Sequence, residues 1–308
     1  MKPFISVIIP TYNHAKFLNR ALKSVLEQNY DNWEAIVIDN HSCDDTDEVV
    51  SNLGDDRIRL LKIHNDDVIA ASRNLGIIEA KGDWLAFLDS DDYWYSTKFE
   101  TVMSYLTPSE KYDVVSTDEL LVNQNNGEKK ILRYGPYSKH FYKTMLLYGN
   151  RLSPSATLVR KSFLNYNKLL FREHRKLITV EDYDFWLRLA LNGASFKFVH
   201  SVEGEFTVHG ENNSSKIVLH NNNLKYLLKD HIFNIQSFSN NSEILWDMMR
   251  KQYQLTALLK SKERIYFINK CLEICKTIYM YPVYTLISFS IKIKKLVFVK
   301  MSVVFFKK

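Results

Sequence analysis

Four short runs of mostly apolar residues, each followed by polar ones, constrain the fold of this chain more than any other feature. They cover residues 6–9, 35–38, 58–63 and 84–88. Runs of this length and composition are typical of buried strands. Helical patterns separate them, so strand and helix alternate along the chain. This order predicts an α/β fold with a Rossmann-like, mostly parallel sheet and helices on both faces.

The helical patterns between the runs have recognisable starts. After the first run, apolar residues recur at helical spacing on one face, namely Phe17, Leu18, Ala21, Leu22, Val25 and Leu26. Asn13 precedes this face, and because an asparagine side chain can cap a helix, we expect it to do so here. Further helices are expected to begin at residues 44–46 and 70–76.

Polar residues follow the strands at positions that a parallel sheet brings to one edge. Residues 10–13 follow the first run, residues 39–42 the second, and residues 89–92 the fourth. Open α/β sheets bind ligands in the crevice outside the carboxyl ends of their strands. The sequence therefore predicts one ligand crevice built from these three turns.

The turn after the fourth run is acidic. Asp89, Asp91 and Asp92 lie close together in the sequence and repel one another unless a positive charge separates them. A divalent cation is the obvious candidate, because Mg²⁺ and Mn²⁺ take carboxylate oxygens. The alternative from the residues alone is an acidic turn that caps the next helix.

Five segments occur in an order that matches a known family: SVIIPTYN, VIDNHSCDDT, AASRNLGI, GDWLAFLDSDD and VEDYDFWLRLA. In this order the chain resembles the inverting family 2 glycosyltransferases of the GT-A fold over roughly its first 210 residues. The resemblance implies a metal-dependent, hexosyltransferase-type enzyme that moves a sugar from a nucleotide-diphosphate sugar to an acceptor hydroxyl with inversion. The family's commonest context is bacterial surface polysaccharide, which implies a glycan or lipid-linked glycan acceptor.

The resemblance also assigns residues to the nucleotide sugar. It implies nucleotide contacts from the turn after the first strand and from the end of the second, namely Pro10, Thr11, Tyr12, Asp39 and Asn40. The family often has a second aspartate where this chain has Asn40. An amide both donates and accepts, so a UDP-sugar is favoured while thymidine stays open.

Further roles follow from the same resemblance. Arg73 is expected to face the nucleotide or its diphosphate. Asp91 is expected to contact the Mn²⁺ or Mg²⁺ directly, and Asp89 to contact the ribose or the metal through water. His209 is expected at the metal or diphosphate, where imidazole suits Mn²⁺ better than Mg²⁺. Asp92 is expected to cap a helix or to support the site from behind.

Proton removal is assigned to the Glu-Asp pair. Asp182 matches the family's general base, while Glu181 and Asp184 are expected to orient the acceptor or to stand behind it. Trp94 and Trp186 could stack on a sugar ring, although packing in or near the core is the alternative that we favour for both.

Two other classes of function stay open at this point. One is a non-catalytic nucleotide-sugar or glycan-binding module on the same fold, which would not need a base at position 182. The other is a nucleotidyltransferase, which would need a phosphate loop rich in glycine and lysine after the first strand, where residues 10–13 read Pro-Thr-Tyr-Asn.

The chain is expected to have three parts. Residues 1–100 form the nucleotide-sugar half of the catalytic domain, residues 101–212 the acceptor half, and residues 213–308 a helical extension with a basic, apolar tail. In the acceptor half we expect a strand at residues 114–117, a hairpin between residues 120–122 and 130–132, and a helix at residues 182–191 with Gly193 at its end. In the extension we expect helices at residues 219–235, 244–259 and 263–279.

Charge and cysteine content narrow the partners and the compartment. A net charge of +6 suits an anionic substrate or membrane surface, and it is weak evidence for nucleic-acid binding, which we do not expect. The three cysteines form no paired framework, which argues for a reducing compartment. No signal peptide and no apolar run long enough to span a bilayer are expected.

The C-terminal tail combines aromatic and aliphatic residues with lysines. No acidic residue follows Glu273, and seven lysines do: Lys276, Lys292, Lys294, Lys295, Lys300, Lys307 and Lys308. This composition suits a segment that lies in the interface of an anionic membrane. We therefore expect a cytoplasmic protein held peripherally at the inner face of the cell membrane. The alternative is a helix that packs its apolar side on the catalytic domain.

Overall fold

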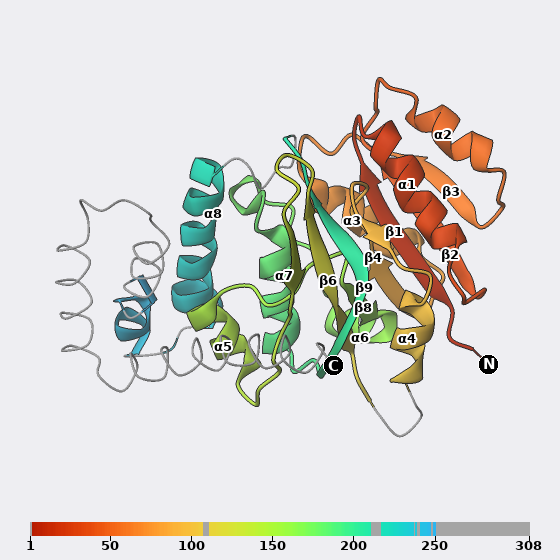
Figure 1. The fold of residues 1–308 in the computed structure, drawn as a ribbon. Helices are drawn as coiled ribbons and strands as arrows, with labels where there is room; N and C mark the ends of the chain where they lie inside the picture. The colour runs from red at the N-terminus through yellow and green to blue at the C-terminus, as the bar shows by residue number, and fades with distance from the viewer. Residues whose placement is uncertain are drawn as a thin grey trace. The chain divides into compact units, whose positions relative to one another are not determined.

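The computed structural model describes residues 2–106, 111–210, 217–236, 238, 241–247 and 249–250. The chain divides into two compact units, Met1–Leu228 and Lys229–Lys308. The first unit contains the whole sheet (Figure 1). The boundary at residue 228 differs from the functional division that we drew after residues 100 and 212, and that division stays a prediction.

Nine strands of the described residues form one sheet in the order β3-β2-β1-β4-β8-β6-β9-β5, with β7 paired to β6. Their bounds are β1 Ile5–Thr11, β2 Trp33–Asp39, β3 Ile58–Lys62, β4 Trp84–Phe87, β5 Tyr93–Trp94, β6 Val114–Asn123, β7 Lys129–Leu132, β8 Thr157–Arg160 and β9 Phe196–Val208. The four runs identified in the sequence are β1 to β4. They pair in parallel, as predicted.

The helices of the first unit are α1 Ala15–Leu26, α2 Thr46–Leu53, α3 Ile69–Glu79, α4 Lys98–Ser104, α5 Phe141–Tyr148, α6 Lys161–Asn167, the 3₁₀ turn η1 Arg175–Leu177, α7 Glu181–Leu191 and α8, which begins at Ile217 and ends at Asp230 just beyond the unit. A π-helical turn, His231–Ile235, follows α8. These elements confirm the helices expected after the first, second and third strands and at residues 182–191.

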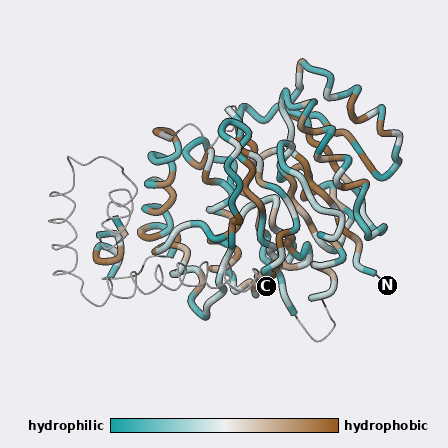
Figure 2. The backbone as a smooth tube through the Cα atoms, viewed as in Figure 1, coloured by the Kyte–Doolittle hydropathy of each residue, from teal (hydrophilic) through white to brown (hydrophobic). Residues whose placement is uncertain are grey.

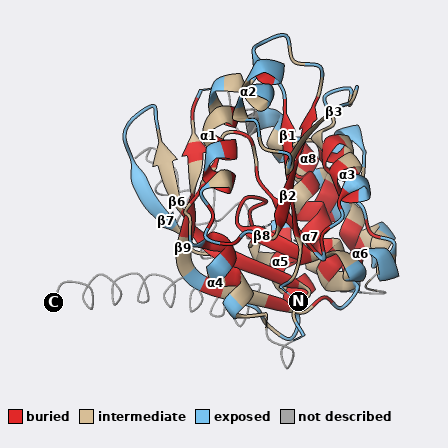
Figure 3. Ribbon diagram, turned by 90° about the vertical axis from the view of Figure 1, so that its right-hand side faces the viewer, coloured by how far each residue is buried: buried red, intermediate tan, exposed pale blue. Residues whose placement is uncertain are grey.

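Helices cover both faces of the parallel half. On one face, Leu18, Leu22 and Val25 of α1 pack in a buried cluster with Val7 and other strand residues. Alternate residues of a strand point to opposite faces, so Ile8 belongs to the other face, which α3 covers. Figure 3 shows β1 and β2 as buried strands and α2 as a mixture of mainly exposed and intermediate residues. In Figure 2, hydrophobic residues concentrate along the central strands.

Helix α3 approaches the sheet closely because it carries a glycine there. A Cβ atom on Gly76 would lie 2.5 Å from Cγ2 of Ile8 and 2.9 Å from Cδ1 of Ile38. Both distances are shorter than real contacts allow, so a side chain at this position would push α3 off the sheet. Arg73 lies one turn before Gly76 in the same helix.

The acceptor half adds antiparallel strands to the parallel ones. Strand β8 pairs antiparallel with both β4 and β6, and β9 pairs parallel with β6. The expected hairpin is present, since Leu120 pairs with Ile131 and Leu121 with Lys130. The sheet is therefore parallel in its first half and mixed in its second.

Two predictions about helix ends have different outcomes. Gly193 follows α7 with a φ of 81°, in the left-handed conformation that favours glycine, as expected. The capping prediction for Asn13 is wrong. Asn13 has a φ of 53° and uses its side-chain oxygen to accept a hydrogen bond from the backbone N–H of Cys43. His14 holds the capping position of α1 and makes no side-chain cap.

Most of the predicted extension lies outside the described residues. This holds for the helix at residues 263–279, for most of that at residues 244–259, and for the whole basic tail after residue 279. Where the structure is described, no helix combines the length and apolarity needed to cross a bilayer.

Candidate active site

The carboxyl ends of β1, β2 and β4 meet at one edge of the sheet. Thr11 at the end of β1 lies opposite Asp39 at the end of β2, and Ile8 lies opposite Phe87 at the end of β4. The backbone N–H of Asn40 donates to the carbonyl of Thr11 at 3.0 Å, which ties the two turns together. The single crevice predicted from the sequence therefore has its three turns side by side.

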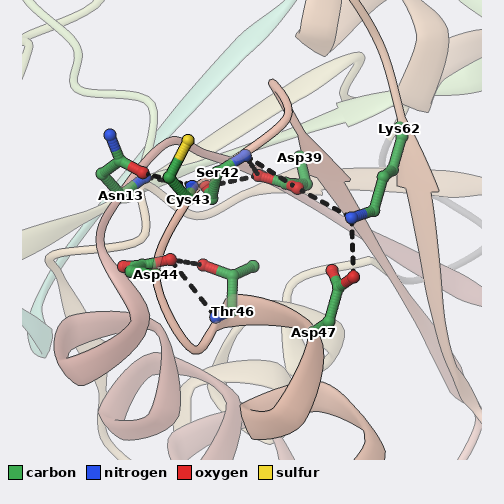
Figure 4. A network of polar contacts seen from close by, with 8 residues as sticks. All are labelled: Asn13, Asp39, Ser42, Cys43, Asp44, Thr46, Asp47 and Lys62. Atoms are coloured by element: carbon green, nitrogen blue, oxygen red, sulfur yellow. Dashed lines mark hydrogen bonds and ion pairs between the residues drawn. The ribbon is translucent and has the colours of Figure 1, made fainter.

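Asp39 is fully buried and accepts hydrogen bonds from the loop that follows β2. Its carboxylate accepts hydrogen bonds from the backbone N–H and the hydroxyl of Ser42, and Nζ of Lys62 lies 3.7 Å from Oδ2 (Figure 4). On the other side of the loop, Asn13 binds the backbone of Cys43. These contacts tie the loop after β2 together, and the nucleotide contact of Asp39 stays a prediction.

The other residues assigned to the nucleotide differ in exposure. Pro10 and Thr11 lie buried at the end of β1, while Tyr12 is half exposed at the rim. Asn40 is already engaged, since its side-chain oxygen accepts from the backbone N–H of Asn65 at 3.0 Å. In the described structure, the buried Thr11 hydroxyl has no hydrogen-bond partner.

The three aspartates of the acidic turn have separate surroundings. Asp89 accepts a hydrogen bond from Arg73 at 2.8 Å. Oδ2 of Asp91 lies 2.9 Å from Nε2 of His209. Burial, together with the charge of Asp89, raises the pKa of Asp91. An ionised Asp91 therefore needs additional positive charge at this point.

Asp92 supports the turn from inside the protein. It accepts hydrogen bonds from the hydroxyl of Ser155 and, at 2.8 Å, from the backbone N–H of Thr207. Burial, followed by the charge of Asp91, raises its pKa well above the usual range. Because Asp92 leads into a strand and not into a helix, the capping alternative for it is wrong.

Trp94 also lies behind the site. It is fully buried, and its indole N–H donates to the carbonyl of Ser155 at 2.7 Å. It therefore packs in the core, as favoured, and does not stack on a sugar ring. Its indole holds Ser155, the residue that binds Asp92. Trp186 is fully buried in the core as well.

Asp91 of the acidic turn and His209, which directly follows β9, are the residues that fit a divalent cation. A carboxylate oxygen and an imidazole nitrogen form a donor pair that suits Mn²⁺, and Mg²⁺ and Mn²⁺ commonly complete their shells with water and substrate phosphate. Where the structure is described, no group of three or more His, Cys, Asp or Glu side chains could hold a metal ion.

Arg73 connects the acidic turn to the acceptor half. Its guanidinium is 2% exposed and donates to Asp89 and to Oε1 of Glu181, both at 2.8 Å. Burial opposes its charge, but attraction to the two carboxylates outweighs this and raises its pKa. Arg73 is therefore a buried link between the acidic turn and the start of α7.

Asp182 lies in the first turn of α7, next to Glu181. It accepts a hydrogen bond at 2.9 Å from the side-chain amide of Asn150. Burial, and then the negative charge of Glu181, raise the pKa of Asp182 to about 7, although Arg73 partly offsets them. A carboxylate with such a pKa suits a general base near neutral pH.

The two carboxylates expected beside the base face elsewhere. Glu181 is 7% exposed and pairs with Arg73. Asp184 is fully buried and forms a two-point ion pair with Arg172. The expectation that Asp184 orients the acceptor is therefore wrong.

The site also contains residues that the sequence did not single out. Asn150 binds the base, Ser155 binds Asp92, and Nδ1 of His14 lies 3.2 Å from Oγ of Ser90. The ring of His209 stacks on Phe17 with the ring centres 4.5 Å apart. His14 directly follows the turn after β1, so its position was a usable signal. Asn150 and Ser155 lie in a loop without a motif.

Residues 6–165 match the model of a known family, which is slightly more than half of the 308 residues. The model is that of glycosyl transferase family 2. The chain belongs to glycosyl transferase family 2. This confirms the resemblance carried by the five sequence segments, and the protein is a glycosyltransferase.

A curated relative and two solved structures agree with the assignment. The chain is 30% identical over 210 residues to the UDP-Glc:alpha-D-GlcNAc-diphosphoundecaprenol beta-1,3-glucosyltransferase WfaP of Escherichia coli, covering 67% of this chain and 77% of WfaP. Staphylococcus aureus TarS in complex with UDP-GlcNAc matches with a TM-score of 0.63 and 19% identity, over 89% of this chain and 80% of TarS. The mannosyltransferase PcManGT of Pyrobaculum calidifontis, in complex with GDP-Man and Mn²⁺, matches with a TM-score of 0.56 and 15% identity, over 92% of this chain and 82% of PcManGT. The two structures support the GT-A fold expected for this family 2 member.

Proposed function

We propose that this glycosyltransferase transfers a hexose from a UDP-sugar to a hydroxyl of a lipid-linked glycan, with inversion, in the synthesis of a bacterial surface polysaccharide. The donor class and the acceptor class follow those named for WfaP. The donor sugar and the linkage are not specified by this proposal. Residues 1–100 would bind the donor and residues 101–212 the acceptor.

The link formed by Arg73 is the observation that carries the proposal. One buried guanidinium contacts Asp89, on the donor side, and Glu181, the neighbour of the base. A protein that only binds a nucleotide sugar has no need to connect that site rigidly to a carboxylate whose pKa is about 7. A transferase does need this, because attack requires the base, the acceptor and the anomeric carbon to be aligned.

On the donor side, the loop after β2 and the turn after β1 would hold the nucleotide. Asp91 and His209 would hold the Mn²⁺ or Mg²⁺, with Asp89 nearby, and this cation would supply charge neutralisation for the departing diphosphate. The structural support is the Asp91–His209 pair and the raised pKa of Asp91.

On the acceptor side, Asp182 would accept the proton of the attacking hydroxyl. As the acceptor oxygen bonds to the anomeric carbon, the bond from that carbon to the diphosphate oxygen breaks and its electron pair leaves with the UDP. A single displacement of this kind inverts the anomeric centre. The beta linkage named for WfaP, made from UDP-Glc, fits the same outcome.

The acceptor class suggests a place for the tail. A lipid-linked acceptor stays in the membrane, and the seven lysines after Glu273 would attract an anionic membrane surface. We propose that the protein works peripherally at the cytoplasmic face of the cell membrane. Truncation after Tyr279 should abolish binding to anionic liposomes at low salt while the protein stays folded. If the intact protein ignores such liposomes, the membrane proposal fails.

The decisive experiment measures UDP release from a panel of UDP-sugars with a synthetic α-D-GlcNAc-diphospho-lipid and Mn²⁺. We expect release only when donor and acceptor are both present, and NMR of the product should show a β linkage from an α-linked donor. Binding of a nucleotide sugar without turnover on any acceptor would favour the binding-module alternative. A retained linkage would contradict the single displacement.

A further inference from the structure

The turn that leads into the base contains a residue in an unfavourable backbone conformation. Thr179, three residues before Asp182, has a φ of 73°. This left-handed conformation is an outlier for a β-branched residue, and it persists only where the surrounding structure enforces it. The contacts of this turn identify what enforces it.

Helix α8 contacts the turn at two points, the carbonyl before Thr179 and the Thr179 side chain. The side-chain amide of Asn223 donates to the backbone carbonyl of Ile178 at 2.9 Å. Nδ1 of His220 lies 3.2 Å from the hydroxyl oxygen of Thr179. His220 and Asn223 are three residues apart and therefore share one face of α8, which lies beside α7 in Figure 1.

Asn223 belongs to a stretch of three asparagines. It is only 6% exposed, so its hydrogen bond to the Ile178 carbonyl is shielded from solvent. The two before it, Asn221 and Asn222, are exposed. Three asparagines in a row are typical of a solvated helix face. The structure separates one member from the other two and gives it a buried contact.

The conformation at Thr179 sets the direction in which α7 begins. The next residue, Val180, is 1% exposed, and its N–H donates to the carbonyl of Leu177 at 2.9 Å. Val180 occupies the capping position of α7 and provides no side-chain cap. The start of α7 therefore depends on the turn before it, and α7 carries Glu181 and Asp182 in its first turn.

We propose that helix α8 positions the catalytic base, with His220 and Asn223 acting as positioning residues that hold the Thr179 turn in its strained conformation. The proposal rests on the proposed function, because it assigns these residues to the base of that reaction. It gives α8, which no family motif covers, a role in the chemistry. Relaxation of the turn would swing the first turn of α7 and move Asp182 relative to the acceptor.

The test compares Asn223→Ala with Asn221→Ala, which removes the same side chain from an exposed position of the same helix. With UDP-glucose, Mn²⁺ and the GlcNAc-diphospho-lipid, we expect Asn223→Ala to lower kcat by roughly tenfold to a hundredfold, the range in which small misplacements act. The KM for UDP-glucose should change less than twofold. The acidic limb of the pH profile should shift, because Asp182 leaves the surroundings that raise its pKa. Asn221→Ala should match the parent protein.

A second set of variants, built on Thr179→Gly, tests whether the strained backbone conformation at Thr179 is what His220 and Asn223 hold. Glycine adopts a positive φ without penalty. In a Thr179→Gly variant, the contacts of His220 and Asn223 with the turn should therefore become largely dispensable. In that background, Asn223→Ala should lower kcat less than threefold. Hydrogen exchange of the backbone in residues 178–184 should rise in Asn223→Ala and stay normal in the double variant. If Asn223→Ala does not fold, His220→Ala replaces it, with the same expectations.

Equal kcat and equal pH profiles for Asn223→Ala and Asn221→Ala would overturn the inference, as would an unchanged cost of Asn223→Ala in the Thr179→Gly background. Asp182→Asn is measured in the same assay. If Asp182→Asn is inactive while the α8 variants behave like the parent, only the positioning role fails. If Asp182→Asn stays active, the proposed function fails with it.

Discussion

The side-chain amide of Asn150 donates to Oδ2 of Asp182 across 2.9 Å and so joins the loop after α5 to the first turn of α7. This contact favours the ionised form of Asp182 and opposes the effect of burial on its pKa. Asn150 is exposed, so the pair lies where an acceptor could reach it. Asn150 is thus one influence on the charge state of Asp182, beside burial, Glu181 and Arg73, and it can be altered without disturbing the core.

The first prediction concerns pH. A general base works only when ionised, and the pKa of Asp182 is about 7. Activity should therefore fall as the pH drops through about 7 and level off about one pH unit above it. Asp182→Asn should lose about 10²–10⁴ in kcat while it still binds the donor. Near-normal kcat in this variant would place the base elsewhere.

The same pKa predicts a change in stability. The pKa of Asp182 is raised in the folded protein, so the folded state binds its proton more tightly than the unfolded chain does, and ionisation at higher pH costs stability. Asp182→Asn should therefore be more resistant to thermal unfolding than the parent at pH 8. The difference should shrink at pH 4, where Asp182 is neutral in the folded protein. A variant less stable than the parent at pH 8 would contradict the raised pKa.

Asn150 offers a directional test of the base. Asn150→Ala removes a hydrogen bond that favours ionisation, so the acidic limb should move to higher pH. Asn150→Asp places a second carboxylate at the same distance and should move it further. Solvent screening limits both shifts, because Asn150 is exposed. An acidic limb that stays fixed in both variants would mean that it reports another group.

Removal of the charge on Arg73 should destabilise the protein strongly. Arg73→Met keeps the length of the side chain but leaves Asp89 and Glu181 without their partner, and such changes at buried pairs typically cost about 3–5 kcal/mol. Arg175→Met is the control, because the Arg175–Asp66 pair spans 4.0 Å between side chains that are mostly exposed. Such a pair contributes about 0–1 kcal/mol. Urea unfolding measures both, and similar losses would refute the buried link.

Metal dependence gives a further prediction. Chelation with EDTA should abolish transfer, and Mn²⁺ should restore it better than Mg²⁺ because His209 offers a nitrogen donor. His209→Ala should reduce the advantage of Mn²⁺ over Mg²⁺. Full activity in a metal-free preparation would exclude the cation.

The sequence was most informative where local pattern decides the structure. Apolar runs located β1 to β4, and their polar ends located the crevice, because parallel strands bring those ends together. The helical spacing also argues against an acceptor contact for Asp184. Residues two apart on a helix point in nearly opposite directions, so Asp182 and Asp184 could not both face the acceptor.

The contacts that the sequence did not predict are long-range. Asn150 is 32 residues from Asp182, and Asn223 is 45 residues from Ile178. Whether a polar residue in a loop meets a carboxylate depends on the path of the loop, which no local pattern encodes. Asn13 failed as a cap for a related reason, since its backbone and side chain are fixed by the neighbouring turn at Cys43.

The glycine of α3 has a consequence for how this protein tolerates variation. Gly76 is not among the residues assigned to the donor or the acceptor. A single added methyl group would nevertheless collide with Ile8 and Ile38. The collision would lift α3 and carry Arg73 away from Asp89 or from Glu181. In a saturation library scored for activity, position 76 should therefore be as intolerant as the base itself. The absence of a side chain at position 76 thus sets how closely α3, and Arg73 with it, approaches the sheet.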